Sequence, residues 1–572
     1  LCAIYGGFYL DPARRPGGAA AAFNLLLAAM LLVLLARDAV VLLIAWEVMT
    51  VASYLLVSYD HHAPAVRRAG WVFLIAGHLG VACLLALFVL LGQLAGSLGF
   101  SELAARPLDG SAATIAAVLA LLGFGVKAGI VPLHVWLPEA HAAAPSHVSA
   151  AMSAVMIKLG LYGILRTLGF LAPAGWWGPV LAGLGAVSAL VGIALALYQR
   201  DLKRALAYSS IENVGIILLG LGVGLWAAQA QRPEIAALAL SGALLHIWNH
   251  AAMKSLLFLG AGSLLHGAGT RDLEAMGGLM RRMPRTGALV MLGAVAIAGL
   301  PPLAGFSSEW LVYRGLVAGG LAPQLAGNQV LWFIVALIAL ATVGVLAVLC
   351  FVRITGIALL GQPRGDDAAH AHESSAGMVA PMAVLAVVIV AMPFVAPRLV
   401  GLLGPAIAQL ARAAPSTAPA SAVLAPIAWL GLALWLAFAA GMLVLRRLAS
   451  RAGAPARQDD TWGCGYAAPT PRMQYTSGSF AESMLQLLPR ALRARIVVRR
   501  EASPFPARGE LVSDRADPFT RSAYEPLLDR LGKRFAQLHW VQQGITHLYV
   551  LYIIATVVIA LAVVRIYQGW GP

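Results

Sequence analysis

Ionisable residues recur inside stretches of this sequence that are otherwise apolar enough to cross a membrane. An ionised side chain at mid-bilayer costs on the order of 2.5–3.5 kcal/mol by insertion scales, so such residues usually serve a function. His246, His250 and Lys254 follow one another at intervals of four and therefore share one helix face. The main candidates are Glu47, Lys127, Lys158, His246, His250, Lys254 and Glu309.

Proton transfer is the chemistry that such a set of side chains suits best. Burial lowers the pKa of a lysine and raises that of a carboxylic acid, and a neighbouring opposite charge reverses both shifts. A lysine whose carboxylate partner moves away or is neutralised can therefore release its proton near physiological pH. Histidines at helical spacing can relay that proton between lysines.

Three weaker candidates and two competing explanations accompany this set. The weaker candidates are His78, Glu212 and His134. His78 could instead be a core histidine that donates to a backbone carbonyl, and Glu212 could be a carboxylate at the membrane interface. His134 could be a polar group at the end of a helix. Static ion pairs could explain the lysines and carboxylates, but several such groups spread along one bundle favour a hydrophilic axis. Metal binding by His246 and His250 lacks a third acidic or thiol ligand nearby.

The composition places these residues in a membrane protein. Hydrophobic residues make up 60% of the 572 residues and charged residues only 11%, with a mean hydropathy of +0.81. A soluble domain would have about 25% charged residues. The net charge of +15 comes from basic residues at the ends of spans, as the positive-inside rule predicts, and no basic groove or stacking-aromatic motif suggests nucleic acid.

The apolar stretches predict an all-α polytopic fold of about thirteen transmembrane helices, because only helices satisfy the backbone locally in lipid. The predicted spans are 20–36, 39–59, 70–95, 112–140, 146–171, 177–199, 205–227, 236–266, 286–317, 329–360, 376–396, 422–446 and 546–567. Basic clusters such as Arg67 with Arg68 and Arg281 with Arg282 fall on one side, which is therefore predicted to be cytoplasmic.

Two of these spans contain internal prolines and glycines, as in KAGIVPLHVWLPEAH from Lys127 and AGLPPLAGFSSEW from Ala298. Broken helices are tolerated in membranes where they line a polar cavity. An offset of five spans reverses topology, so residues 20–171 and 177–360 are predicted to be two inverted five-helix repeats with the functional site at the breaks. Two ordinary proline kinks are the other explanation.

The remaining segments are predicted to be a loop at 1–19, two further spans within 376–446, a cytoplasmic polar segment at 451–545 and a final span at 546–567. Between Ala523 and Gly544, leucines and a phenylalanine recur at helical spacing among charged residues, which indicates an amphipathic helix at the membrane surface. The four cysteines are scattered without a CxxC or Cys/His cluster, so no haem, zinc or iron–sulfur centre is expected in this chain.

Several strings make the chain resemble the antiporter-like subunits shared by complex I, the multisubunit cation/proton antiporters and the membrane-bound hydrogenases. They are the WE of the second span, KAGIVPLHVWLPEAH, MIKLGLYGILR, QRDLKRALAYSSIENVG, HIWNHAAMKSLLFLGAGS and GLPPLAGFSSEW. They cover roughly residues 5–360. Within this group the chain is most similar to the hydrogenase-4 and formate hydrogenlyase large membrane subunits. The strings that carry this similarity are PSHVSAAMSAVMIKLG, SSEW and CGYAAPTPRMQYTSGSF.

This resemblance implies roles for the charged residues. It implies that Glu47 and Lys127 form a carboxylate–lysine pair, that Lys158 carries the proton onward and that Glu309 is the terminal group. The helix bearing His246, His250 and Lys254 would be the central relay between them. The family also has about three further spans before the first one here, and the chain starts at Leu1, so we expect the native protein to extend upstream.

The resemblance also implies a subunit that translocates ions and makes no covalent bond itself. Its partners would be other membrane subunits and a peripheral redox arm, with [NiFe] and iron–sulfur centres confined to those partners, in a bacterial inner membrane. The alternatives are a multisubunit cation/proton antiporter subunit without a redox partner, an NADH-quinone oxidoreductase membrane subunit, or a membrane anchor that does not pump. Gene neighbours would separate a redox complex from an antiporter.

Overall fold

Helices make up almost all of the structure, a computed structural model. It describes residues 1–10, 17–322, 325, 327–413, 416–451, 470–480, 495–500, 509–514, 517–537, 551, 554–556 and 558–559. Among these residues, eleven helices are long and apolar enough to cross a membrane. The chain divides into two units, Leu1–Arg515 and Ala516–Pro572, and each is described by itself.

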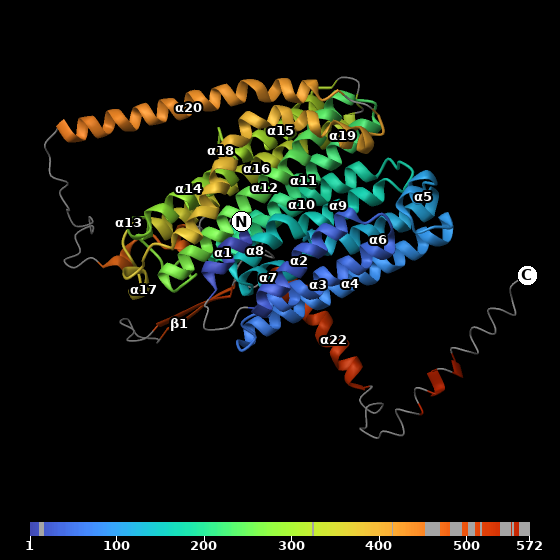
Figure 1. The fold of residues 1–572 in the computed structure, drawn as a ribbon, viewed down its shortest axis with the longest axis horizontal. Helices are drawn as coiled ribbons and strands as arrows, with labels where there is room; N and C mark the ends of the chain where they lie inside the picture. The colour runs from blue at the N-terminus through green and yellow to red at the C-terminus, as the bar shows by residue number, and fades with distance from the viewer. Residues whose placement is uncertain are drawn as a thin grey trace, which may run out of the picture. The chain divides into compact units, whose positions relative to one another are not determined.

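The first unit is a bundle of long helices with an all-α architecture, as predicted (Figure 1). Its first part consists of α2 (Gly17–Leu35), α3 (Ala39–Val57), α4 (Pro64–Ala95), α5 (Phe100–Ala105), α6 (Gly110–Ala128), α7 (Trp136–Ala143), α8 (Ser146–Ala151), η2 (Met152–Met156) and α9 (Ile157–Leu168). α8, η2 and α9 run on without interruption, and together they make one membrane span.

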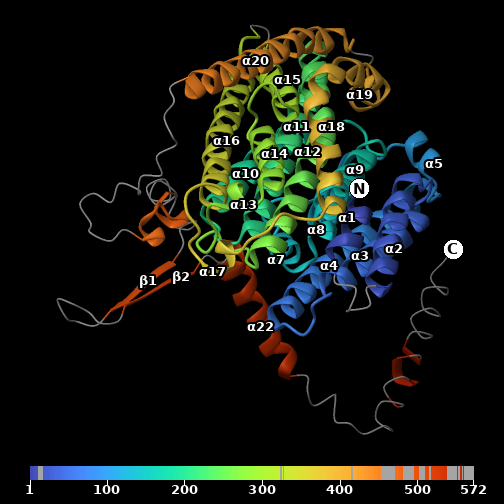
Figure 2. The same cartoon turned by 60° about the vertical axis from the view of Figure 1, so that its left-hand side comes forward.

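The second part of the bundle surrounds one long central helix. Its elements are α10 (Trp177–Tyr198), α11 (Leu202–Gln229), α12 (Pro233–Ala268), α13 (Leu279–Arg282), α14 (Pro284–Ile297), α15 (Ala304–Gly320), α16 (Gly327–Leu359), α17 (Asp366–Ala369), α18 (Ala376–Leu402), α19 (Gly404–Ala411) and α20 (Ala418–Arg451). α12 packs against α11, α14, α15 and α18 at once (Figure 2). Side chains on α12 can therefore reach several other helices.

Both predicted breaks are real interruptions of the helix. α6 ends at Gly129, whose φ of +76° suits glycine, and the chain resumes as α7. α14 ends just before Gly299, with φ +68°, and resumes as α15. The predicted ninth span is therefore two helices, of 14 and 17 residues. The predicted last span, 546–567, lies almost entirely outside the described residues, so the count of thirteen stays a prediction.

The loop predicted at 1–19 is wrong for its first residues, which form helix α1 (Cys2–Tyr9). Tyr5 is completely buried; its hydroxyl donates to the carbonyl of Leu259 at 2.8 Å and lies 3.0 Å from Ser263 Oγ. The short string CAIYGGFY contains two glycines and shows no helical periodicity of apolar residues. Packing of α1 against α8, α12 and α18 holds the helix in place.

The polar segment predicted at 451–545 contains structure that the sequence did not suggest. β1 (Arg495–Arg500) and β2 (Gly509–Asp514) form an antiparallel hairpin. Residues 470–480, including the short 3₁₀ helix η3 (Pro471–Met473), lie against the bundle: Gln474 Nε2 donates to the carbonyl of Gln362 at 3.2 Å. The remainder of 452–494 lies outside the described residues.

In the second unit, the π-helix η5 (Thr520–Tyr524) leads into α22 (Glu525–Ala536), inside the stretch predicted to be amphipathic. Leu527, Leu528, Leu531 and Phe535 of α22 are all exposed. Residues beyond 537 in that predicted helix are not among those described. An exposed apolar stripe on a charged helix is typical of a surface that meets lipid or a partner.

We expect the combined replacement of Leu528, Leu531 and Phe535 by serine to weaken assembly. Each such side chain contributes on the order of 1.5–3 kcal/mol when buried. The bundle should keep its stability, because these side chains lie outside the first unit. The measurement is the yield of intact complex after detergent purification, compared with serine replacements on the polar face at Asp529, Arg530 and Lys533. Equal yields from both triple variants would argue against docking through this stripe.

Candidate functional site

Lys127 lies in the last turn of α6, directly before the first break, and is buried. Its ammonium donates to Thr50 Oγ1 on α3 at 3.0 Å and lies 4.9 Å from the centre of the Phe73 ring and 5.9 Å from that of Trp46. The aromatic faces stabilise a cation where water is excluded. Glu47 stands one turn before Thr50, so the two share a face of α3.

Glu47 is less enclosed than the sequence suggested. Its side chain is 33% exposed, and its carboxylate lies 3.9 Å from His78 Nε2, whose side chain is 55% exposed. His78 also bonds the carbonyl of Leu74 through Nδ1 at 2.9 Å. Glu47 and His78 therefore face outward from the bundle, whereas the buried Lys127 bonds Thr50.

Lys158 follows the π-helix η2 on a helix that packs closely on α6. Gly160 lies so near the backbone of Phe124 and Ala128 that an added Cβ would come within 2.6 Å of both. This close approach brings the helices that carry Lys127 and Lys158 together. The ammonium of Lys158 donates to the carbonyl of Ser153, inside η2. π-Helical turns of this kind are frequent at functional sites.

Polar side chains of α11 connect Lys158 with Lys254. Ser153 Oγ shares a hydrogen bond of 2.8 Å with Ser210 Oγ, which donates to the carbonyl of Leu206 at 3.0 Å. That same carbonyl accepts from the ammonium of Lys254 at 2.8 Å, and Lys254 also bonds Ser209 Oγ. Every polar group in this series is buried. The two lysines thus bond the main-chain carbonyls of Ser153 and Leu206, and the hydroxyls of Ser153 and Ser210 connect these two residues.

His246 joins this region to the second break. Its Nε2 donates to Asn213 Oδ1 on α11 at 3.0 Å, and its Nδ1 bonds Ser308 Oγ on α15 at 2.9 Å. Asn213 Nδ2 donates to the carbonyl of Ser209 at 2.8 Å, which leads back to the partner of Lys254. His246 therefore bridges α11 and α15 from its position on α12.

His250 lies one turn further along α12, with its ring parallel to that of His246 at a centroid distance of 6.2 Å. Both ring nitrogens are buried and have no hydrogen-bond partner among the described residues. No cluster of three His, Cys, Asp or Glu side chains that could hold a metal occurs in the described part of the chain.

Glu309 directly follows Ser308 on α15 and is buried at the second break. Its carboxylate lies against Gly299, where an added Cβ would come within 2.8 Å of Oε2. A larger residue at 299 would displace the carboxylate, which gives this glycine a second reason to be present besides its positive φ. The glycine at the break in the helix thus makes room for the acidic side chain of Glu309.

The interfacial position considered for Glu212 stays a prediction. Glu212 is 1% exposed in the middle of the bundle, where Asn213 Nδ2 donates to Oε2 at 3.3 Å. His134 is also fully buried, within the first break, with its ring 6.4 Å from that of Tyr208. Both residues lie inside the protein near the relay.

Sequence reasoning missed the uncharged members of the network, because serine and asparagine do not stand out against an apolar background. Their spacing held the signal: Ser209 and Asn213 are one turn apart in the string AYSSIENVG and share a helix face. The missed residues are Ser153, Ser209, Ser210, Asn213 and Ser308.

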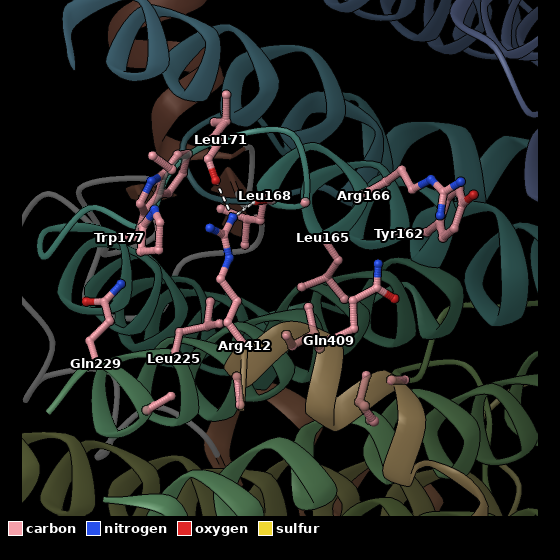
Figure 3. A pocket seen from close by; sticks show the side chains of 18 of the residues that line it. Tyr162, Leu165, Arg166, Leu168, Leu171, Trp177, Leu225, Gln229, Gln409 and Arg412 are labelled. Atoms are coloured by element: carbon pink, nitrogen blue, oxygen red, sulfur yellow. Dashed lines mark hydrogen bonds between the residues drawn. The ribbon is translucent and has the colours of Figure 1, made fainter. Parts of the chain in front are cut away.

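A separate cavity of about 490 Å³ lies among the ends of α9, α10 and α11 and beside α19 (Figure 3). Arg412 of α19 reaches across it to donate to the carbonyls of Leu168, at 2.9 Å, and Leu171. Leu165, Leu225 and other apolar side chains make up much of its wall. None of the predicted site residues lines this cavity, so we leave it outside the pathway.

Comparison with known proteins agrees with this geometry. Residues 36–334 match the family described as NADH:quinone oxidoreductase/Mrp antiporter, transmembrane. The chain is 35% identical over 556 residues to hydrogenase-4 component B of Escherichia coli K12, covering 92% of this chain and 80% of that protein. It is 36% identical over 373 residues to formate hydrogenlyase subunit 3 of the same organism, covering 64% and 59% of the two chains.

Two solved structures share the fold. One is the archaeal membrane-bound sulfane sulfur reductase, with a TM-score of 0.66 and 24% identity over 98% of this chain and 88% of that one. The other is the Mrp complex from Dietzia sp. DQ12-45-1b, with a TM-score of 0.60 and 27% identity over 88% and 55%. Both comparisons agree with the fold of the bundle described above.

The fold and the buried polar series define a multi-pass membrane protein of the antiporter-like class. The chain belongs to the NADH:quinone oxidoreductase/Mrp antiporter transmembrane family. It is an antiporter-like membrane subunit of the type found in redox complexes, and the relatives named above are subunits of multi-subunit membrane complexes.

Proposed function

We propose that this chain translocates protons as a subunit of a redox-driven complex in a bacterial inner membrane. The supporting observation is the buried series from Lys158 through Ser153 and Ser210 to Lys254, continued by His246 to Ser308. A series of titratable groups and hydroxyls in a water-excluded bundle suits proton movement. The chain would make and break no covalent bond other than those to the transferred proton.

The order of groups suggests a direction. Glu47 and Lys127 act as the first carboxylate–lysine pair, Lys158 carries the proton onward, and Glu309 accepts it last. His246, His250 and Lys254 form the central relay. A lysine is cationic when protonated, whereas a glutamic acid is neutral. A lysine at one break and a glutamate at the other make the two ends of the path inequivalent. Proton movement along the path would therefore have a preferred direction.

The two broken helices support a division into inverted repeats at 20–171 and 177–360. Lys127 and Glu309 lie at the corresponding broken helices, Lys127 directly before its break and Glu309 after the other. In this scheme the chain would belong to an assembly of the kind formed by its hydrogenase-4 and formate hydrogenlyase relatives. A peripheral redox arm would hold the [NiFe] and iron–sulfur centres, and the long segment 451–545 would face it from the cytoplasm.

A second candidate function is a subunit of a multisubunit cation/proton antiporter or of an NADH-quinone oxidoreductase. The likeness to the Mrp complex and the family match favour this alternative as well. Genes for hydrogenase large and small subunits beside this one would support the first proposal, and genes for small antiporter subunits would support the second.

Replacing Lys127 by alanine tests whether the chain moves protons at all. We expect redox-driven proton uptake by inverted membrane vesicles to fall about a hundredfold, the scale of losing a positioned proton-transfer group. Complex abundance should persist, because the substitution leaves the helix ends and the break intact. Lys533→Ala, on an exposed face of α22, is the matched control and should pump normally. Equal pumping by both variants would contradict the proposed path.

A further inference from the structure

A second polar cavity lies at the end of the bundle that is predicted to be cytoplasmic. It has a volume of about 330 Å³ and is bounded by the ends of α1, α3 and α12 and by the turn after α7. Lys203, His266, Asp60 and Tyr9 contribute polar side chains to its wall. Unlike the cavity beside α19, this one is lined by a buried lysine that leads toward the relay.

The rim of this cavity is braced by two crossed ion pairs. Arg271 Nε lies 2.5 Å from Asp201 Oδ2, and Arg200 Nη2 lies 3.0 Å from Asp272 Oδ2. The backbone repeats the connection, since Leu202 N donates to the carbonyl of Arg271 at 3.0 Å. The loop before α11 is thereby fixed to the loop after α12. The cavity is therefore a built feature of the fold.

Lys203 stands at the inner end of the cavity. The residue is 2% exposed, and its ammonium donates to the carbonyl of Ala144, which caps the end of α7 behind the first break. Ser149 Oγ contacts the same carbonyl at 3.4 Å. Ser149 is one helical turn from Ser153, the residue that connects Lys158 to Ser210. Ser149 thus joins the carbonyl that Lys203 bonds to the continuous helix α8–η2–α9, which carries Ser153 and Lys158.

His141 provides a titratable group near Lys203. It is completely buried, its ring stacks on Phe258 at 5.1 Å, and neither ring nitrogen has a hydrogen-bond partner among the described residues. Its ring interacts electrostatically with the charges of Lys203, Lys158 and Lys254. Positive charge on these lysines disfavours protonation of the ring, so His141 can hold a proton only while a neighbouring lysine is neutral.

We propose that this cavity is a vestibule for protons from the cytoplasmic side, and that Lys203 is a further proton carrier that delivers them to the Lys158–Lys254 relay. The inference rests on the proposed function and adds an intake to it, separate from Glu47 and Lys127. Lys203 Nζ takes a proton from bulk water in the vestibule and passes it inward, with His141 as the receiving group. The competing explanation is that Lys203 only caps α7, since cations commonly bond the last carbonyls of a helix.

The variants Lys203→Arg and Lys203→Met separate these explanations. Arginine keeps the charge and the bond to Ala144 but does not release its proton, so it would satisfy a capping role alone. We expect both variants to assemble and to lower the initial rate of redox-driven proton uptake about a hundredfold or more, within the roughly 10²–10⁴-fold contribution of positioned proton carriers. Lys533→Arg is the control. Normal uptake by Lys203→Arg would establish a capping role and overturn the proposal.

The same experiment distinguishes failure of this inference from failure of the proposed function. If the wild-type complex moves no protons, the proposed function fails; if it pumps and Lys203→Arg pumps equally, only the vestibule fails. A second measurement places Ala143→Cys, at the cavity wall, in a chain whose four native cysteines are replaced. A membrane-impermeant thiol reagent applied from the cytoplasmic side should label it and slow proton uptake. Absence of labelling would show that the cavity is closed to water and contradict the proposal.

Discussion

Replacing Glu309 by glutamine is expected to abolish proton movement while the subunit remains assembled. Glutamine keeps the shape of the side chain against Gly299 but cannot gain or lose a proton. If Glu309 is the terminal acceptor, its loss should lower redox-driven proton uptake by inverted vesicles about a hundredfold, the scale for a positioned acid or base. Glu309→Ala should behave in the same way, since titration and not shape is the property removed.

The matched control for this variant is Glu102→Gln on the short helix α5, where the carboxylate is exposed. It removes the same charge from the same kind of side chain outside the relay and should leave uptake unchanged. His78→Ala should have a smaller effect than Glu309→Gln, because His78 lies on the outer surface beside Glu47. Wild-type uptake by Glu309→Gln would make Glu309 a structural polar group and remove the directional scheme.

Hydropathy was sufficient to predict the bundle, since each lipid-facing helix must be apolar over its whole length. The breaks were also predictable, because glycine and proline close together at 129–132 and 299–302 disfavour a continuous helix. α1 was not predictable in this way. Its eight residues are too few to form a helix alone, and it is held by contacts to Leu259 and Ser263, which are more than 250 residues distant.

The charged candidates were found because a charge inside an apolar span is conspicuous, whereas their connections were not. Lys158 and Lys254 are linked by hydroxyls and a carbonyl on α11, and a linear sequence does not state which helix lies between them. The same limit explains Glu212. The residues around it in the sequence did not show that packing of the neighbouring helices around α11 buries its side chain almost completely.

Arg353 shows how a segment outside the apolar spans can become part of the bundle. Its side chain is fully buried on α16, and its guanidinium donates to the carbonyls of Ala196 and Gln199, at 3.1 and 3.0 Å, at the end of α10. A third bond of 2.5 Å reaches Ser477 Oγ in the segment 470–480. One arginine thus caps a helix and fastens the tail to the bundle.

We therefore expect Arg353→Ala to cause the largest loss of stability among the substitutions considered. Hydrogen bonds to charged groups contribute roughly 1.5–3 kcal/mol each. The substitution also removes the desolvation cost of the guanidinium, so the net loss of unfolding free energy should be smaller than the sum of the three bonds. We expect a net loss on the order of 4–5 kcal/mol. Thermal unfolding of the purified complex measures it, with the exposed Arg314→Ala as control. Ser477→Ala removes only the bond to the tail and should cost much less. If both variants unfold like the wild type, the end of α10 does not depend on Arg353, and the tail is held by its other contacts, such as those between Gln474 and Gln362.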